Sequence, residues 1–507
     1  MNQSITDRTM NKLLKPGPLL LLMALTLWGC KDPWEDHLKP VEGLPGENLF
    51  ELLQNNPDLS TFTAYLIEAG WQDELESSKS FTVWAPDNEA MGTVDAAELS
   101  DSASLALFVN NHIGFSAYPY YTEVKQLVVK TFSGKNLHID NENGKIGDAN
   151  LEEPYDRLAS NGILHVIDKA LVPKPNAWEI IESTDQAPEH VDYLKSLSGT
   201  VFDPSIATII GVDPASGKPV YDTLSGMVWS NRLIAQVRDL RVEDSLSTVF
   251  LIDDIAWESE FQKFRPYFKL ADSVASDELT RWLVSRDLVF RGQTPLEDMP
   301  DTLVSLFGIK IPFDHTSIQK VYEASNGTVY VLGNCDIRLG DKIHPWIVEG
   351  EDTNHVTEIA VSGMTGYTRQ VPLASGGYDF ILDNHGANPG SIKYHMGEFA
   401  AGYYDFYWVA VNDFRASYRN PNSSTVLYQR LEFVRYLGMA GHEMLWSTPS
   451  TISDLIEVVD STYETAREVY LGRRFFTTYQ DVWLQVTGSG RNTTICLDYL
   501  KAVPELE

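Results

Sequence analysis

Ala159-Ser-Asn-Gly-Ile-Leu-His-Val-Ile-Asp-Lys-Ala-Leu-Val-Pro173 is the stretch of this chain that decides its fold. Its first four residues recur at Ala324-Ser-Asn-Gly327. An apolar run precedes each copy by 75 to 78 residues: Phe81-Thr-Val-Trp-Ala-Pro86 in the first, and Val249-Phe-Leu-Ile252 in the second. A paired landmark that recurs at one distance indicates a duplicated domain. In both copies Asn-Gly predicts a tight turn that leads into a closing strand.

Length, charge and cysteine content set the broad class of the protein. A chain of 507 residues, 43% hydrophobic and 11% aromatic, predicts several folded domains. Its formal net charge of -32 disfavours nucleic acid as a partner, because the phosphate backbone would be repelled by nearly every face. The three cysteines, Cys30, Cys335 and Cys496, are too few for a disulfide framework.

Residues 1–29 have the pattern of a secretory signal. Basic residues precede an apolar run, Leu19 to Trp28, that is about half as long as a membrane-spanning helix. The run ends in Leu27-Trp-Gly-Cys30, which resembles the bacterial lipobox, although Trp28 is bulkier than the residue usual there. The acidic stretch after Cys30 resembles the surface-export signal of lipoproteins from Bacteroidetes-type bacteria. We therefore expect lipidation of Cys30 and anchoring in the outer membrane, facing the cell exterior; the alternative is an ordinary cleaved signal with an incidental cysteine.

After a proline-rich tether at residues 30–47, residues 48–175 resemble a fasciclin-like domain. Phe81-Thr-Val-Trp-Ala-Pro-Asp-Asn-Glu-Ala-Met91 resembles the first signature of that family, and the stretch that opens this section resembles the second. Asn111-His112-Ile113 is similar to its central element. The resemblance implies an α+β fold, a role in adhesion or in contact with proteins or glycans, and no catalytic residue. For His112 and His165 we expect hydrogen-bonded framework roles.

Residues 188–345 resemble a divergent second fasciclin-like domain. The apolar run and the Ala-Ser-Asn-Gly turn are both present, but the Ala-Pro pair of the first signature is missing. Arg286-Asp287-Leu288 stands where the first copy has Asn-His-Ile, so the family histidine is absent from this copy.

The sequence pattern of residues 346–507 differs from that of the preceding segments, because predicted short aromatic strands separated by Gly, Asn and Pro dominate it. This pattern predicts an all-β sandwich of the jelly-roll type. Three landmarks resemble galactose-binding-like, carbohydrate-binding modules: Ile347-Val-Glu-Gly-Glu-Asp352, the strand entry at 397–408, and Leu497-Asp-Tyr-Leu-Lys-Ala-Val-Pro504. The predicted fold class is therefore multidomain, with two α+β domains followed by the sandwich.

The resemblance to these modules implies one structural cofactor, a calcium ion. Carried over by position, its ligands would be Glu349, Glu351 and Asp498. Calcium takes several hard oxygen ligands at once, which three carboxylates supply. The alternative is a solvated acidic edge.

Sugar binding would need exposed aromatic planes beside polar side chains. Trp446, Tyr394 and His395 are the candidates in apparent loops, with Asp383 and Asn384 as polar partners. Ser391 stands near the position where the family usually has a tryptophan, which puts the usual sugar site in doubt. Core packing is the alternative role for each of these aromatic residues.

The search for enzyme motifs finds neither a Gly-x-Ser-x-Gly elbow nor a phosphate-binding Gly-x-x-x-x-Gly-Lys loop in the sequence. The sequence therefore favours a non-enzymatic surface lipoprotein that binds an extracellular glycan or matrix protein. One alternative is an architectural subunit of an outer-membrane nutrient importer of the starch-utilisation type. The other is an unrecognised glycan-degrading enzyme, because a pair of catalytic carboxylates has no spacing rule in sequence.

Overall fold

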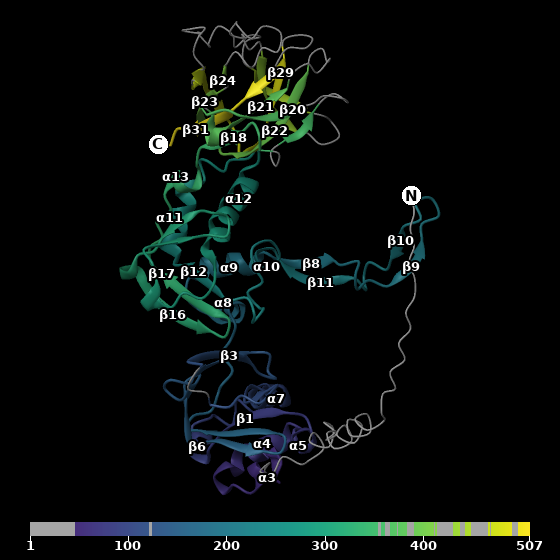
Figure 1. Ribbon diagram of the computed structural model, residues 1–507, viewed down its shortest axis with the longest axis vertical. Helices are drawn as coiled ribbons and strands as arrows, with labels where there is room; N and C mark the ends of the chain where they lie inside the picture. Colours follow the sequence, from purple (N-terminus) through teal and green to yellow (C-terminus); the bar gives the residue numbers. More distant parts are fainter. Residues whose placement is uncertain are drawn as a thin grey trace, which may run out of the picture. The chain divides into compact units, whose positions relative to one another are not determined.

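The computed structural model describes residues 46–120, 124–352, 356–359, 366–372, 374–382, 390–409, 411–412, 429–436, 442–447, 465–466, 468–488 and 495–506. The chain divides into two compact units, with the boundary between Pro173 and Lys174 (Figure 1). This boundary lies close to the predicted end of the first domain at residue 175. The second unit contains both the predicted second domain and the predicted C-terminal module. It begins before residue 188, the predicted start, because the apolar side chains of α8 (Ala177–Ser183) pack into its core.

The first unit is built on a seven-stranded sheet in which the two signature strands are neighbours. β1 (Phe81–Pro86) is parallel to β7 (Gly162–Ile167), so the segments that open and close the domain are hydrogen-bonded to each other. The strand order is β2-β1-β7-β6-β5-β4-β3, with β2 (Ile113–Gly114), β3 (Gln126–Lys130), β4 (Asn136–Asp140), β5 (Lys145–Ile146) and β6 (Ala149–Ala159).

Both faces of the central strands are buried in the first unit. Because successive side chains of a strand point to opposite faces, Val83 enters one hydrophobic cluster and Trp84 enters another. The first cluster is completed by the helices of this unit: α3 (Leu49–Gln54), α4 (Ser60–Glu68), α5 (Gln72–Glu76), α6 (Asn88–Met91) and α7 (Ser102–Asn111).

Asn161 ties the turn before β7 to the helices. Its side-chain oxygen accepts a hydrogen bond from the Leu49 N–H at 2.8 Å. Its amide group donates to the carbonyls of Leu75 and Ser77, both at 2.7 Å. The sequence predicts the Asn-Gly turn; the structure adds that the asparagine is a three-bond clamp between segments far apart in the chain.

The N-terminal part of the second unit repeats this arrangement. β12 (Ser247–Ile252) is parallel to β17 (Gly327–Leu332) in the sheet order β13-β12-β17-β16. Asn326 accepts from the Ala177 N–H at 2.9 Å and donates to the carbonyls of Leu240 at 2.8 Å and Val242 at 3.2 Å, as Asn161 does in the first unit. The other elements are α9 (Pro188–Ser196), α10 (Arg232–Gln236), α11 (Asp254–Phe264), α12 (Ser273–Ser285), β13 (Val289–Arg291), β14 (Thr302–Val304), β15 (Lys310–Pro312), β16 (Ile318–Ala324) and α13 (Leu339–Lys342).

The strand registers correct the sequence alignment of the two copies by one residue. His112 precedes the residue that pairs with Val83, and Leu288 precedes the residue that pairs with the equivalent Val249. Leu288, and not Asp287, therefore stands at the position of His112. The sequence comparison placed this segment one residue too early because it had no pairing partner to fix the register.

Between α9 and α10 the chain forms a projecting two-stranded ribbon, residues 198–231, which we call the arm (Figure 1). β8 (Ser198–Phe202) pairs with β11 (Met227–Asn231), and β9 (Ile209–Val212) pairs with β10 (Pro219–Tyr221). Gly226 and Asn231 are buried, and all other arm residues are partly or fully exposed.

Residues 346–506, which we call the C-terminal module, are largely β in their described part. A four-stranded sheet, β18-β31-β23-β28, and a five-stranded sheet, β19-β22-β29-β25-β26, bury side chains in one shared core together with the three-stranded sheet β20-β21-β30. The strands are β18 (Trp346–Glu349), β19 (Val356–Ile359), β20 (Gly366–Gln370), β21 (Tyr378–Leu382), β22 (Ser391–Phe399), β23 (Gly402–Val409), β24 (Val411–Asn412), β25 (Gln429–Tyr436), β26 (His442–Ser447), β27 (Thr465–Ala466), β28 (Val469–Phe476), β29 (Gln480–Gly488), β30 (Ile495–Leu497) and β31 (Tyr499–Pro504). The jelly-roll topology stays a prediction.

Among the described residues, no helix is both long enough and apolar enough to cross a membrane. Cys30 lies outside the described residues, so its lipidation also stays a prediction.

Candidate functional site

The two histidines of the first unit have the contacts of framework residues. His112 is fully buried; its Nε2 accepts from the Leu171 N–H at 2.8 Å, and its Nδ1 donates to the Phe108 carbonyl at 2.8 Å. Burial lowers the pKa of His112 to about 4, so the imidazole is neutral at neutral pH. His165 is also buried and lies 2.9 Å from the Tyr118 carbonyl, and burial lowers its pKa as well. These contacts match the framework roles expected from the sequence.

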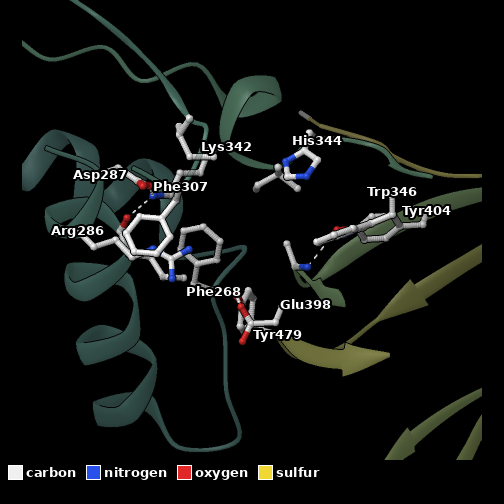
Figure 2. A pocket seen from close by; sticks show the side chains of 14 residues that line it. Phe268, Arg286, Asp287, Phe307, Lys342, His344, Trp346, Glu398, Tyr404 and Tyr479 are labelled. Atoms are coloured by element: carbon white, nitrogen blue, oxygen red, sulfur yellow. Dashed lines mark hydrogen bonds and ion pairs between the residues drawn. The ribbon is translucent and has the colours of Figure 1, made fainter. Parts of the chain in front are cut away.

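A cavity of about 200 Å³ lies within the second unit, where the C-terminal module docks against the segment after α11 and against α12 (Figure 2). Two backbone hydrogen bonds hold the parts together: the Ala401 N–H donates to the Tyr267 carbonyl at 2.7 Å, and the Tyr479 N–H donates to the Lys269 carbonyl at 2.6 Å. The walls of the cavity combine aliphatic and charged side chains with five aromatic ones, those of Phe268, Phe307, Trp346, Tyr404 and Tyr479.

The acidic groups that line this cavity are already held by neighbouring side chains. Lys342 donates to the carboxylate of Asp287, and Asp287 also accepts from the Ser305 hydroxyl at 3.0 Å. Glu398 accepts from the Tyr479 hydroxyl at 2.5 Å. Both carboxylates in the lining are therefore held by neighbours, and this cavity does not offer the two free, facing carboxyl groups that glycoside hydrolysis uses.

The residues predicted as calcium ligands meet at one end of the C-terminal module. Glu349 ends β18, and Asp498 lies just before β31, the strand with which β18 pairs. Ser375 connects the two, because its hydroxyl donates to Glu349 Oε1 and its N–H donates to Asp498 Oδ1, each at 3.0 Å. The Oε2 atoms of Glu349 and Glu351 are buried and have no hydrogen-bond partner.

The carboxylates of Glu349, Glu351 and Asp498, which we call the acidic cluster, are ligands of the type that calcium takes. Their side chains are not arranged to surround an ion. Burial, together with the charges of Glu349, Glu351 and Asp379, raises the pKa of Asp498 to about 7. Two orphaned carboxylate oxygens are ligands of the kind that calcium takes. Within the described residues, however, no group of three or more His, Cys, Asp or Glu side chains is arranged to hold a metal ion. Calcium therefore stays a prediction, and no other feature of the site depends on it.

The raised pKa of Asp498 makes the stability of the C-terminal module depend on pH. The ordinary pKa is 3.8, and the folded-state pKa is about 7, so between these values the folded state holds a proton that the unfolded state releases. Stability is therefore expected to fall as the pH rises from about 4 to about 7. Thermal unfolding of the full chain, followed by amide exchange in β31, measures this effect.

The Asp498→Asn variant serves as the control, because it is expected to lose most of this pH dependence. Calcium binds ionised carboxylates, so millimolar calcium is expected to stabilise the wild-type module most at neutral pH. A wild-type module whose stability rises between pH 4 and 7 would contradict the raised pKa.

The predicted sugar-stacking residues lie on strands, where the sequence suggested loops. Tyr394 and His395 belong to β22, and the backbone of Trp446 in β26 pairs with Phe433. Tyr394 is fully buried, and its hydroxyl donates to the Gly350 carbonyl at 3.1 Å, so its proposed role in ligand stacking is wrong. The alternation of β22 turns this ring into the core.

The remaining candidates have different outcomes. His395 is the neighbour of Tyr394 that points outward, as described below. The side chain of Trp446, and the residues Asp383 and Asn384, lie outside the described residues. Ser391, which stands near the usual family tryptophan, begins β22 and is buried.

His395 lies on an outward-facing polar surface that the sequence reasoning missed. It is paired across the strands with Trp483, a partly exposed residue of β29, and the two rings lie 4.8 Å apart. His395 Nε2 also contacts Asp481 Oδ1 at 2.6 Å. The next row of the same face pairs Lys393 with Gln485. We call these five residues the outer face.

A signal for Trp483 was present in the sequence. In Asp481-Val-Trp-Leu-Gln-Val486 the aliphatic residues occupy every second position, and all three are buried. Strict alternation places Trp483 on the opposite, polar side of the strand. A tryptophan among polar residues on such a face is a stronger candidate for ligand contact than one in a presumed loop.

Comparison with known proteins finds a family match for one part of this chain. Residues 57–173 match the fasciclin domain family. Transforming growth factor-beta-induced protein ig-h3 of Sus scrofa is 29% identical over 132 residues, which are 25% of this chain and 19% of that protein. Human periostin is 24% identical over 143 residues, 27% of this chain and 17% of that protein. The match thus spans less than a fifth of the length of either relative.

Among solved structures, a FAS1 domain pair from the insect cell adhesion molecule Fasciclin I is 14% identical, with a TM-score of 0.22. That alignment covers 57% of this chain and 100% of the FAS1 pair. On the sequence match, residues 57–173 of this chain are a fasciclin domain.

Proposed function

We propose that this chain is a non-enzymatic binding protein of the cell surface, anchored in the outer membrane through Cys30, which contacts an extracellular glycan with the outer face of its C-terminal module. The fasciclin domain supports a role in adhesion, because the family is linked to contact with proteins and glycans. Residues 188–345 are proposed to act as a second, divergent fasciclin-like domain.

The observation that carries the glycan proposal is the position of Trp483. A partly exposed indole offers an apolar plane, and the neighbouring His395, Asp481 and Gln485 offer hydrogen-bond donors and acceptors. Sugars have an apolar face and a rim of hydroxyl groups, so this combination of side chains suits them. Matrix proteins remain the second class of ligand for the same surface.

Trp483→Ala is expected to weaken glycan binding at least tenfold, because the central aromatic residue of a binding surface contributes most of its free energy. The measurement is a glycan array with the full chain, followed by calorimetry on the best-bound glycan. Phe475→Ala is the matched control, since Phe475 is an aromatic residue of β28 that is 56% exposed on the other large sheet. It is expected to bind as the wild type does.

Two results would count against the glycan proposal. One is a folded wild-type chain that binds no glycan on the array. The other is a Trp483→Ala variant that binds with unchanged affinity, which would move the contact to another surface.

The second candidate function is an architectural subunit of a surface complex such as a nutrient importer. The exposed apolar residues of the arm favour it, since large apolar surfaces mark sites of protein association.

A further inference from the structure

The cavity beside the C-terminal module contains hydrogen-bond donors that have no acceptor. Its two carboxylates, those of Asp287 and Glu398, are held by neighbouring side chains. Arg286 also lines the cavity, but no residue that the structure describes accepts a hydrogen bond from its guanidinium or forms an ion pair with it, and its Nε is buried. Proteins rarely leave a buried donor without an acceptor, so Arg286 is a candidate for contact with a ligand.

The guanidinium of Arg286 is held in place by packing. Arg286 directly follows α12, and its guanidinium carbon lies 4.4 Å from the centre of the Phe307 ring. An arginine that is stacked on an aromatic ring keeps the edge of its planar group available for hydrogen bonds, and it stays protonated at any ordinary pH. The cavity therefore contains a fixed positive charge with several N–H donors.

Tyr404 supplies a second donor from the C-terminal module. Its side chain is buried in the wall of the cavity, and its hydroxyl oxygen accepts from the Ala400 N–H at 3.0 Å. The hydrogen of this hydroxyl has no acceptor in the part of the chain that the structure describes. Burial raises the pKa of Tyr404, so the hydroxyl keeps its proton at neutral pH. Figure 2 shows that Arg286 and Tyr404 enter the cavity from opposite sides.

The size and the other walls of the cavity restrict the body of a ligand. An apolar cavity of about 150 Å³ accommodates benzene. The volume of about 200 Å³ found here therefore has room for one ring with short polar groups at its ends. Phe268, Leu283, Ile309 and Ile343 also line the cavity, and their side chains have no groups that could bond the many hydroxyls of a sugar. The ligand is thus expected to have an apolar body.

The charges around the cavity favour a ligand with a single negative charge. Lys342 is paired with Asp287, which leaves the cation of Arg286 for a ligand. The two oxygens of one carboxylate match the N–H groups of a guanidinium. A phosphate group would bring a second negative charge into a cavity that already contains Glu398, and like charges repel strongly where water is scarce.

A ligand has a path into the cavity. Phe307 is 41% exposed and His344 is exposed, so the lining reaches solvent at these two residues.

We propose that this cavity binds a small aromatic monocarboxylate. Its carboxylate accepts from Arg286, and an oxygen at the other end of the ring accepts from the Tyr404 hydroxyl. The cavity shares no lining residue with the outer face, so this site does not depend on glycan binding there. Because Arg286 follows α12 and Tyr404 belongs to β23, a bound ligand would connect the C-terminal module to the preceding part of the unit.

The test is calorimetry on the full chain with 4-acetylbenzoate, which has a carboxylate at one end of its ring and a carbonyl oxygen at the other. The wild type is expected to bind it saturably at one site. The neutral 4-acetylbenzamide is expected to bind at least about tenfold more weakly, because it offers no charge to Arg286. The dianion 4-acetylphenyl phosphate is expected to bind more weakly than the carboxylate too.

Arg286→Met removes the charge and keeps an unbranched side chain against Phe307. It is expected to weaken the binding of 4-acetylbenzoate at least about tenfold. Arg281→Met is the matched control, because Arg281 lies on α12, its guanidinium carbon is 4.5 Å from the centre of the Phe261 ring, and it does not line the cavity. The control changes the charge equally and is expected to bind as the wild type does.

Tyr404→Phe tests the other end of the ligand through a ratio of affinities, which a general loss of stability would not change. The wild type is expected to prefer 4-acetylbenzoate to 4-isopropylbenzoate by about two- to tenfold, because the isopropyl group has a similar shape and no acceptor. Tyr404→Phe is expected to lose this preference.

Four results would overturn the proposal. A folded wild-type chain that does not bind millimolar 4-acetylbenzoate would show that the cavity is a water-filled joint. Equal binding by Arg286→Met and the wild type would place the ligand elsewhere. Equal binding of the carboxylate and the amide, or of the carboxylate and the phosphate, would contradict the charge argument. An unchanged preference in Tyr404→Phe would contradict the contact with the hydroxyl.

Discussion

Replacing Gly327 by alanine is expected to destabilise the N-terminal part of the second unit by more than about 4 kcal/mol. Losses of this size come from severe steric or electrostatic defects. An added Cβ at this position would lie 1.8 Å from the carbonyl oxygen of Ser247 on the neighbouring parallel strand. The contact atom belongs to the backbone, so β12 and β17 would have to separate. The backbone φ of +152° adds strain for any residue with a side chain.

Urea unfolding of the full chain, followed by amide exchange in peptides from β12 and β17, measures the effect of Gly327→Ala. Gly162→Ala is the equivalent change in the first unit, with its Cβ 2.0 Å from the Phe81 carbonyl oxygen, and it is expected to act in the same way. Gly199→Ala is the control, because no atom lies within 4 Å of its Cβ position. A Gly327→Ala protein that unfolds at the wild-type urea concentration would disprove the close approach of the two strands.

Removing the cation of Lys342 is the second change with a large expected effect. In Lys342→Met, the carboxylate of Asp287, which is fully buried, keeps Ser305 but loses its positive partner. An uncompensated buried charge costs about 3 to 5 kcal/mol. The free energy of unfolding of the second unit, measured in urea, is therefore expected to fall by that amount.

A double variant separates charge from packing in this prediction. Asp287→Asn combined with Lys342→Met removes the uncompensated charge and is expected to recover most of the stability lost in the single variant. Lys174→Met is the exposed control, since its pair with Glu323 lies at the surface and is expected to contribute less than about 1 kcal/mol. Equal losses in the single and double variants would mean that packing alone explains the effect.

The repeated turn was predictable from sequence because its chemistry is local. Asn-Gly specifies a tight turn, which joins the antiparallel pairs β6–β7 and β16–β17, and the apolar runs around it specify buried strands. The parallel pairing of β1 with β7 and of β12 with β17 joins strands far apart in the chain, so no local motif predicted it. The clamp made by Asn161 was not predictable, since its partners Leu75 and Ser77 lie more than 80 residues away.

The site residues were less predictable because the exposure of a strand residue depends on which face of the sheet its side chain occupies. Tyr394 and Trp483 are both aromatic residues of nine-residue strands, yet one is buried and the other lies on the outer face. Position within the alternation distinguishes them, and residue type does not. The acidic cluster needed the pairing of β18 with β31 as well, which no local pattern specifies.

The arm was missed for a different reason. Runs such as Ile209-Ile-Gly-Val212 have the composition of buried strands, so the sequence favours a core position for them. They are exposed because no other described segment of the second unit covers them, and whether a strand is covered depends on the whole fold.

The clamp of Asn326 spans 149 residues of chain, from Ala177 to the turn before β17, and the arm is part of that span. The entropy lost in closing a long loop grows only with the logarithm of its length, by about 0.6 kcal/mol for each doubling. Inserting residues 198–231 lengthens this loop by far less than a doubling, so the host domain bears a penalty of only a few tenths of a kcal/mol. We therefore expect that the arm can be lengthened, shortened or exchanged without preventing the N-terminal part of the second unit from folding.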